Sequence, residues 1–249
     1  MLSTWDLHGH TALVTGAGRR LGRAFAEGLA AGGADLVVHF GGSAEGAEET
    51  ARRARGMGVR AVTLQCDLEK AGEAEALIGR AVEAVGEVDW LINSAAIFEA
   101  LDVEGTTAEA WDRHMAINLR APFLLAQAFA RHRSGGEGTI VNILDWRALR
   151  PGADHLPYTI AKAGLAALTQ SLALALAPTI RVNGLALGAV LPPSDGGGDS
   201  AIRSVPLARW ARVEEAVQAL LFLLAGPSFV TGTILTLDGG RRLVPAETP

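Results

Sequence analysis

Tyr158 and Lys162 are the two residues whose types and spacing most directly suggest catalysis. They lie four positions apart in the segment YTIAK, on one face of a predicted helix. A free tyrosine is a poor acid at neutral pH because its pKa is about 10. A neighbouring ammonium favours the phenolate, so we expect Lys162 to lower the pKa of Tyr158 towards neutrality. Such a pair can exchange a proton while a nicotinamide exchanges a hydride.

The glycine-rich segment TGAGRRLG, residues 15–22, is the second candidate site. It follows a predicted buried strand and opens a predicted helix, as in a turn whose backbone N–H groups hold a dinucleotide pyrophosphate. An ordinary tight turn is the alternative interpretation. Arg20 stands where a second loop glycine is expected. The residues of this turn that we expect to contact the cofactor are Gly16, Arg19, Arg20, Leu21 and Gly22.

The end of the second predicted strand favours NADPH over NADH. The segment VVHFGGS has no carboxylate before Glu45, whereas an NAD site has an acidic residue there for the ribose 2′-hydroxyl. Arg19, His39 and Ser43 suit a 2′-phosphate, which they would hold by charge-assisted hydrogen bonds. The alternative is that Arg19 and His39 are simply solvated.

The elements that must position these residues alternate along the whole chain. Strands are predicted at 11–16, 34–40, 60–68, 88–96, 138–144, 180–188 and 232–240. Helices are predicted at 20–33, 43–58, 74–86, 107–132, 158–178 and 212–226, and 107–132 is either one long helix or two merged helices. This alternation predicts one α/β domain over residues 1–249, a Rossmann-type doubly wound parallel sheet with helices on both faces. The Pro- and Gly-rich segment 191–204 is predicted to be a loop, either a lid over the site or a passive surface loop.

The composition argues against several functional classes. A net charge of −5 argues against a nucleic-acid partner. The single cysteine, Cys66, permits neither an intramolecular disulfide nor a cysteine metal cluster, and no metal site is predicted. The first ten residues lack the pattern of a signal peptide, and the apolar runs look too short to cross a bilayer. We therefore expect a cytoplasmic protein with no membrane partner.

Taken together, these motifs resemble those of the short-chain dehydrogenase/reductase family. TGAGRRLG, CDL, LINSAA, INL, YTIAK and DGG have the order and spacing of that family over nearly the whole chain. The resemblance implies that Tyr158 donates the proton and that Lys162 binds the nicotinamide ribose. It implies that Asn118 holds a water, or the backbone around Lys162, in the proton relay. The further cofactor contacts that it implies are Asp67, Leu68, Asn93, Ala95, Ala96, Gly188 and Val190.

Two departures from the family pattern concern the substrate. Asp145 stands thirteen residues before Tyr158, where the family has its catalytic serine, and Arg20 replaces a loop glycine. Both departures resemble the pteridine reductase branch, which stacks its pterin on an aromatic residue at the position of Phe98. An ionised carboxylate repels the oxyanion formed from a carbonyl but accepts from the N–H groups of a heterocycle. The alternatives are that Phe98 is an ordinary packing residue and Asp145 a turn cap.

The prediction is therefore an NADPH-dependent oxidoreductase that transfers a hydride to a pterin-like or related nitrogen heterocycle. The alternatives are an NADPH-dependent carbonyl reductase, such as a 3-oxoacyl thioester reductase, and a dinucleotide sensor without turnover. The predicted catalytic residues are Asp145, Tyr158, Lys162 and Asn118, and the predicted substrate contacts are Arg20, Phe98, Asp145 and Tyr158. The helices that contain INLRAPFLLAQAFA and YTIAK are apolar on more than one face, which predicts a homotetramer, with a dimer as the alternative.

Overall fold

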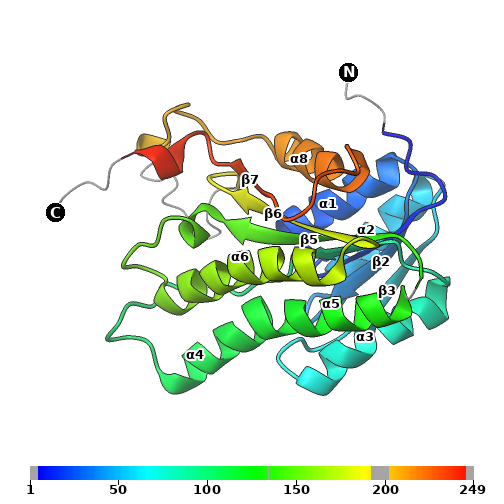
Figure 1. The fold of residues 1–249 in the computed structure, drawn as a ribbon, viewed down its shortest axis with the longest axis horizontal. Coiled ribbons are helices and arrows are strands. Elements are labelled where there is room, and N and C mark those ends of the chain that lie inside the picture. The colour runs from blue at the N-terminus through cyan, green and yellow to red at the C-terminus, as the bar shows by residue number, and fades with distance from the viewer. Residues whose placement is uncertain (1–4, 134, 192–201, 245–249) are drawn as a thin grey trace.

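The computed structural model describes residues 5–133, 135–191 and 202–244, and its architecture confirms the predicted fold (Figure 1). One sheet contains seven parallel strands in the order β3-β2-β1-β4-β5-β6-β7. The strands are β1 (Thr11–Val14), β2 (Asp35–Phe40), β3 (Ala61–Gln65), β4 (Trp90–Asn93), β5 (Gly138–Asp145), β6 (Ile180–Leu187) and β7 (Ile234–Leu237). The order reverses between β1 and β4, which is the place where open parallel sheets bind their ligands.

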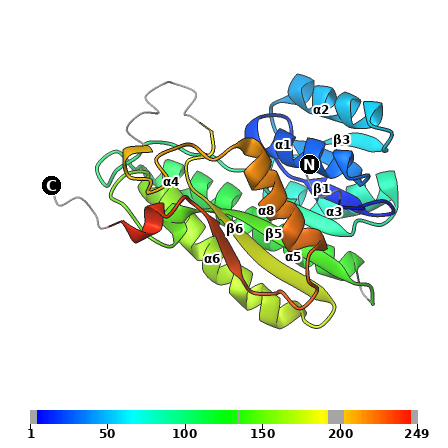
Figure 2. The same cartoon turned by 90° about the horizontal axis from the view of Figure 1, so that it is seen from above.

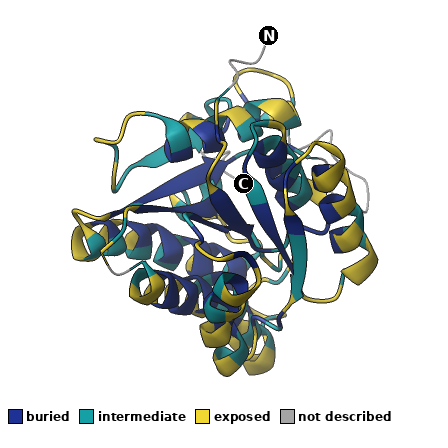
Figure 3. Ribbon diagram, turned by 90° about the vertical axis from the view of Figure 1, so that its right-hand side faces the viewer, coloured by how far each residue is buried: buried dark blue, intermediate teal, exposed yellow. Residues whose placement is uncertain are grey.

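Helices cover both faces of this sheet (Figures 1 and 2). On one face lie α1 (Arg20–Ala31), α2 (Ala44–Gly56) and α8 (Val213–Ala225), and on the other lie α3 (Ala71–Val85), α4 (Ala108–Met115), α5 (Ala121–His132) and α6 (Leu156–Leu176). Successive strand residues face opposite layers: Val14 packs on the α1 side, and Leu13 on the α3 side. Figure 3 shows the strands buried between helices with exposed outer faces.

The predicted helix 107–132 is interrupted in the structure. α4 passes into the π-helical turn η1 (Ala116–Arg120) and then into α5. A π turn holds one extra residue, so it rotates the helix after it relative to the helix before it. Asn118 lies inside this turn, and its side chain binds the backbone of Ile97, beyond the end of β4. The interruption therefore occurs where the helix is tied to the loop after β4.

The long helix α6 corrects one expectation about membranes. It has 21 residues and is apolar enough to cross a bilayer, by length and composition only, so the apolar runs are not all too short. In the fold it packs on the sheet: Leu165 and Ala166 share a buried cluster with Leu144 of β5 and Ala186 of β6. Most of the predicted loop 191–204 lies outside the described residues, and its role as a lid stays a prediction.

Candidate active site

Tyr158 and Asp145 meet at the carboxyl end of β5. Asp145 is the last residue of that strand, Tyr158 lies in the first turn of α6, and the tyrosine hydroxyl donates to Oδ2 of Asp145 at 3.2 Å. Burial and the neighbouring Asp145 carboxylate raise the pKa of Tyr158 well above its ordinary value. The expected lowering of this pKa is therefore wrong, because burial and the Asp145 carboxylate outweigh the opposing charge of Arg147. Tyr158 keeps its proton at neutral pH.

Lys162 lies one helical turn after Tyr158 and is buried. Its Nζ donates to the carbonyl oxygen of Ile143 at 2.7 Å and lies 5.8 Å from the centre of the Tyr158 ring. Burial lowers the pKa of Lys162 to about 8, although Asp145 opposes the shift. An ammonium has three donors, and the described residues occupy one of them here. Lys162 can therefore also donate to the hydroxyls of a bound ribose.

Asn118 acts on the site through Ile97. Its Oδ1 accepts from the N–H of Ile97 and its Nδ2 donates to the carbonyl oxygen of Ile97, both at 3.0 Å. The buried amide is thus engaged with backbone at both ends. These bonds use one donor and one lone pair of the amide, and they give Asn118 a positioning role, because they fix the segment that leads to Phe98. Its part in the proton relay, at a water or at the backbone around Lys162, stays a prediction.

Phe98 forms an aromatic wall beside Tyr158. Its ring meets the Tyr158 ring edge-on, with the ring centres 4.7 Å apart, and stacks on the His155 ring with the centres 4.0 Å apart. The Phe98 side chain is 54% exposed, which is unusual for a large apolar residue that serves only the core. This exposure argues against a core position for Phe98, whereas its contact with substrate, as opposed to a plain pocket wall, stays a prediction.

Three residues that sequence reasoning missed complete a closed circuit of contacts around the site. His155 Nδ1 lies 3.0 Å from Oδ2 of Asp154, Asp154 forms an ion pair with Arg147, and the N–H of Arg147 donates to Oδ1 of Asp145 at 2.8 Å. Asp145 accepts from Tyr158, whose ring contacts Phe98, which stacks on His155. The sequence offers one indication of their role, which is that all three residues lie between Asp145 and Tyr158.

The glycine turn forms a cradle in which Gly16 and Gly22 have no room for a side chain. A Cβ on Gly22 would lie 2.3 Å from the carbonyl oxygen of Gly16, and one on Gly16 would lie 2.9 Å from Cα of Ala95. Thr15 ties the turn to the loop after β4, because its hydroxyl oxygen accepts from the N–H groups of Ser94 and Ala95 at 2.9 and 3.0 Å. The turn and that loop are therefore held in contact.

Free donors line the same cradle. The backbone N–H groups of Gly18, Arg19 and Leu21 have no acceptor within the described part of the chain. They open α1, whose N-terminal dipole favours an anion. The residues present therefore fit a dinucleotide pyrophosphate.

A family model described as Enoyl-(Acyl carrier protein) reductase matches residues 16–242, nearly the whole chain. The chain belongs to the short-chain dehydrogenase/reductase family. It is similar to cis-4-hydroxycyclohexanecarboxylate dehydrogenase of Sinomonas cyclohexanicum, with 37% identity over 94% of this chain and 96% of that one. As a member of this family it is an NAD(P)-dependent oxidoreductase.

Two solved members of the family have the same fold and contain NADP. FolM alternative dihydrofolate reductase 1 from Brucella canis is 32% identical, with a TM-score of 0.89 over 98% of each chain. A short-chain dehydrogenase from Burkholderia cenocepacia J2315 is 34% identical, with a TM-score of 0.90 over 95% of this chain and 99% of that one. The prediction of NADP(H) agrees with both.

His39 has a different role from the one expected in this short-chain dehydrogenase/reductase. It is 1% exposed, its Nδ1 accepts from the N–H of Gly16 at 3.1 Å, and its Nε2 lies 3.0 Å from the carbonyl oxygen of Cys66. Burial lowers the pKa of His39 to about 4, so the ring is neutral at pH 7. A charged contact with a 2′-phosphate is therefore wrong; His39 instead braces the glycine turn against the end of β3.

The other expected phosphate ligands lie at the surface. Arg19 is exposed, and Ser43 sits at the N-terminus of α2, close enough that a Cβ on Gly18 would touch its hydroxyl. The space around Gly42 is open. Two helix N-termini, those of α1 and α2, therefore converge where the 2′-phosphate of NADP(H) is expected.

Arg20 is held in a backbone conformation that favours glycine. Its φ is +50°, in the left-handed region, where a non-glycine residue costs about 1–3 kcal/mol. The side chain is exposed at the first position of α1, beside the free donors of the cradle. A strained arginine at a ligand-binding turn supports a functional use of its guanidinium.

The remaining residues that we expect to contact the cofactor lie at or just beyond the carboxyl ends of β3, β4 and β6. Asp67 follows β3 and lies 3.5 Å from Lys70, Leu68 is buried beside it, and Asn93 points inward to Asn142, its Nδ2 donating at 2.8 Å. The Oδ1 of Asn93 is buried without a partner among the described residues, and its contact with the cofactor stays a prediction. The others are Ala95, Ala96, Gly188 and Val190, of which Val190 is buried and Ala96 exposed.

Proposed function

We propose that this protein is an NADPH-dependent reductase of a pterin-like or related nitrogen heterocycle. The observation that carries the proposal is the pair Asp145–Tyr158, a carboxyl in hydrogen-bond contact with the proton donor, with the open Phe98 ring beside it. Such a ring system presents N–H groups to a carboxyl and a flat face to an aromatic wall. The cofactor is NADP(H), as in the two family members crystallised with it.

The residues of the site have separable tasks in this reaction. When bound, the cofactor supplies a hydride to a carbon of the substrate ring. Tyr158 gives its proton to a neighbouring ring nitrogen, and the Lys162 ammonium stabilises the phenolate that remains. Burial raises the pKa of Asp145. Its carboxylate accepts a hydrogen bond from a ring N–H. Arg20 lies at the cradle, where it can reach both a cofactor phosphate and an acceptor on the ring.

Replacing Asp145 by Ser tests the proposed substrate class. Oxidation of NADPH is monitored with dihydrobiopterin and, separately, with an acetoacetyl thioester. We expect kcat/KM for dihydrobiopterin to fall about tenfold or more, because a charge-assisted hydrogen bond to the ring is lost. Asp112→Ser, an exposed change on α4, is the matched control and should leave both rates unchanged. Retained pterin turnover, or thioester turnover that improves in Asp145→Ser, contradicts the proposal.

A carbonyl reductase is the second candidate. The relative that is 37% identical is named as a dehydrogenase of a hydroxycyclohexanecarboxylate, an alcohol whose oxidation yields a ketone. Tyr158 and Lys162 serve that reaction equally well, since both reactions need one proton for each hydride. The thioester arm of the same experiment supports this second candidate if it gives the faster turnover in the wild type.

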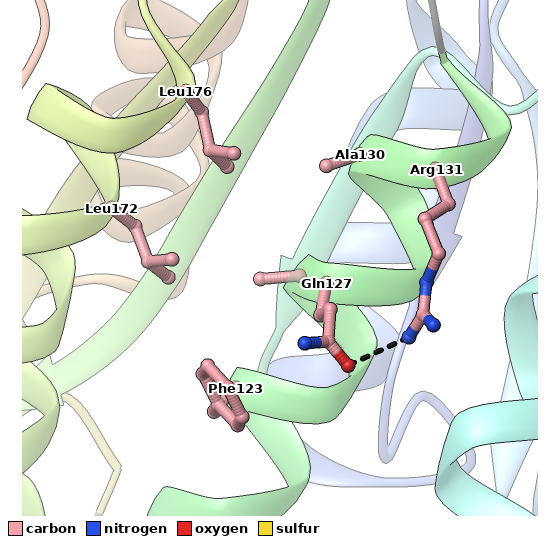
Figure 4. A pocket seen from close by; sticks show the side chains of 7 residues that line it. Phe123, Gln127, Ala130, Arg131, Leu172 and Leu176 are labelled. Carbon is pink, nitrogen blue, oxygen red and sulfur yellow. Dashed lines mark hydrogen bonds between the residues drawn. The ribbon is translucent and has the colours of Figure 1, made fainter.

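We further propose that a second copy of the chain covers the outer faces of α5 and α6, within a homotetramer. An open groove of about 510 Å³ runs between these helices (Figure 4). Its lining residues are Phe123, Ala126, Gln127, Ala130, Arg131, Leu172 and Leu176. The Phe123 side chain is 39% exposed, and apolar side chains gathered in one groove of an apolar helix pair mark a contact surface.

Phe123→Asp is expected to dissociate this assembly, because it places a charge where the two apolar surfaces meet. Molar mass by light scattering measures the result, and the expected shift is from tetramer to a smaller species. Met57→Asp, at an exposed apolar residue directly after α2, should leave the mass unchanged. A monomeric wild type, or equal masses for the wild type and Phe123→Asp, contradicts the proposed interface.

A further inference from the structure

Two guanidinium groups lie over one tryptophan beside the active site. The short turns η2 (Trp146–Ala148) and η3 (Arg241–Leu243) pack against each other, and η3 is the red turn near the C-terminus in Figure 1. The guanidinium carbon of Arg241 lies 4.4 Å from the Trp146 ring centre, and that of Arg147 lies 4.9 Å from it. We call these three residues the arginine–tryptophan cluster.

The positive charge in this cluster is only partly balanced. Arg147 forms an ion pair with Asp154, but Arg241 has neither an ion pair nor a side-chain hydrogen bond within the described residues. The Nε atoms of both arginines are buried without a partner there. Burial and the nearby Arg147 lower the pKa of Arg241, and the carboxylates of Asp145, Asp154 and Asp238 oppose this shift without pairing with the guanidinium. An anion placed at Arg241 would satisfy unused donors.

The cluster borders the site of proton transfer. Trp146 directly follows Asp145, and the N–H of Arg147 donates to that same carboxyl at 2.8 Å. Arg241 belongs to none of the contacts in the active-site circuit, so its charge is not needed to orient Tyr158. A substrate ring between Phe98 and Asp145 therefore has a cationic surface next to it on the Asp145 side.

We propose that the arginine–tryptophan cluster binds a carboxylate carried by the substrate, with Arg241 as its main ligand. A guanidinium over an indole ring can keep its terminal N–H groups available, and these groups pair with a carboxylate through two parallel hydrogen bonds. The substrate would then have two ends: a ring reduced at Tyr158 and an acidic substituent at Arg241. The inference rests on the proposed active site, but it does not require that the ring be a pterin.

Two pairs of substrates, each differing in the acidic substituent, test this inference. The first pair is dihydrofolate, which carries carboxylates, and dihydrobiopterin, which does not. The second is 4-oxocyclohexanecarboxylate and its methyl ester. Steady-state NADPH oxidation is measured for wild type, Arg241→Gln and Arg242→Gln. Arg242 is the matched control, since it is an adjacent, exposed arginine that faces Asp238.

We expect Arg241→Gln to raise KM for the acidic member of the reacting pair about tenfold or more and to change the neutral member less than twofold. Arg242→Gln should change neither. Equal losses on acidic and neutral members, or the same effect from Arg242→Gln, would overturn the carboxylate site while leaving the reductase proposal intact. If only the ketone pair reacts and Arg241→Gln abolishes its acid preference, the heterocycle proposal fails and the carboxylate site stands.

Discussion

Tyr158→Phe is expected to lower kcat by about 10²–10⁴-fold while NADPH binds with nearly the wild-type affinity. The change removes one hydroxyl, which is the proposed proton donor, and keeps the ring that meets Phe98 edge-on. It also frees Asp145 from a 3.2 Å hydrogen bond without altering its backbone contact with Arg147. Turnover is measured under saturating NADPH, and affinity by fluorescence of the bound nicotinamide.

Thr159→Val is the matched control for this prediction. Thr159 is the next residue on α6, it is also buried, and its hydroxyl has no hydrogen-bond partner within the described residues. Valine has the same shape, so loss of this hydroxyl should leave kcat within about twofold. Turnover that survives in Tyr158→Phe, or falls equally in Thr159→Val, would show that Tyr158 is not the acid.

Gly22→Ala should abolish NADPH binding in the accessible concentration range and destabilise the fold by at least about 2 kcal/mol. The added Cβ would lie 2.3 Å from the carbonyl oxygen of Gly16 and 2.9 Å from its carbonyl carbon. Both atoms belong to the backbone of the turn, so α1 and the turn must separate. The N–H groups of Gly18 and Leu21 would then no longer point to one phosphate position. Titration of NADPH and thermal unfolding measure the two effects.

Gly72→Ala makes the same chemical change where the structure has room for it. Gly72 lies in the first turn of α3, and nothing lies within 4 Å of its hypothetical Cβ. Alanine has the higher helix propensity, so this variant should gain up to about 1 kcal/mol and bind NADPH normally. A Gly22→Ala protein that binds NADPH as the wild type does would refute the close packing of the turn.

The fold was predictable because strands and helices alternate with different periods. All seven strands and both helical layers agree with that pattern, and Val14 and Leu13 face opposite layers as alternation requires. The sequence left open whether 107–132 is one helix or two, but the π turn at Asn118 was not predictable, since the apolar spacing continues through it. Its cause is a contact with Ile97, which lies 21 residues earlier in the chain.

The sequence predicts the role of a site residue where the chemical type of its side chain decides that role. It does not predict the role where burial of the side chain decides it. Tyr158, Asp145 and Phe98 come together as expected. The role of His39 was predicted wrongly because the sequence does not show whether a histidine is exposed beside a phosphate site or buried and neutral in the core. Arg241 could not be linked to Asp145 at all, since they are distant in sequence and meet only when η3 packs on η2.

Tyr158, the proposed proton donor, is also the only tyrosine among the 249 residues. Any tyrosinate absorbance from this protein therefore comes from the Tyr158 hydroxyl, without labelling or mutation. Because burial and Asp145 raise its pKa, the native protein should stay free of that signal through the pH range in which an exposed tyrosine ionises. The absorbance of this single tyrosine therefore reports the ionisation of Tyr158. Measuring it after addition of NADP⁺ or a substrate analogue shows directly how each ligand changes that ionisation.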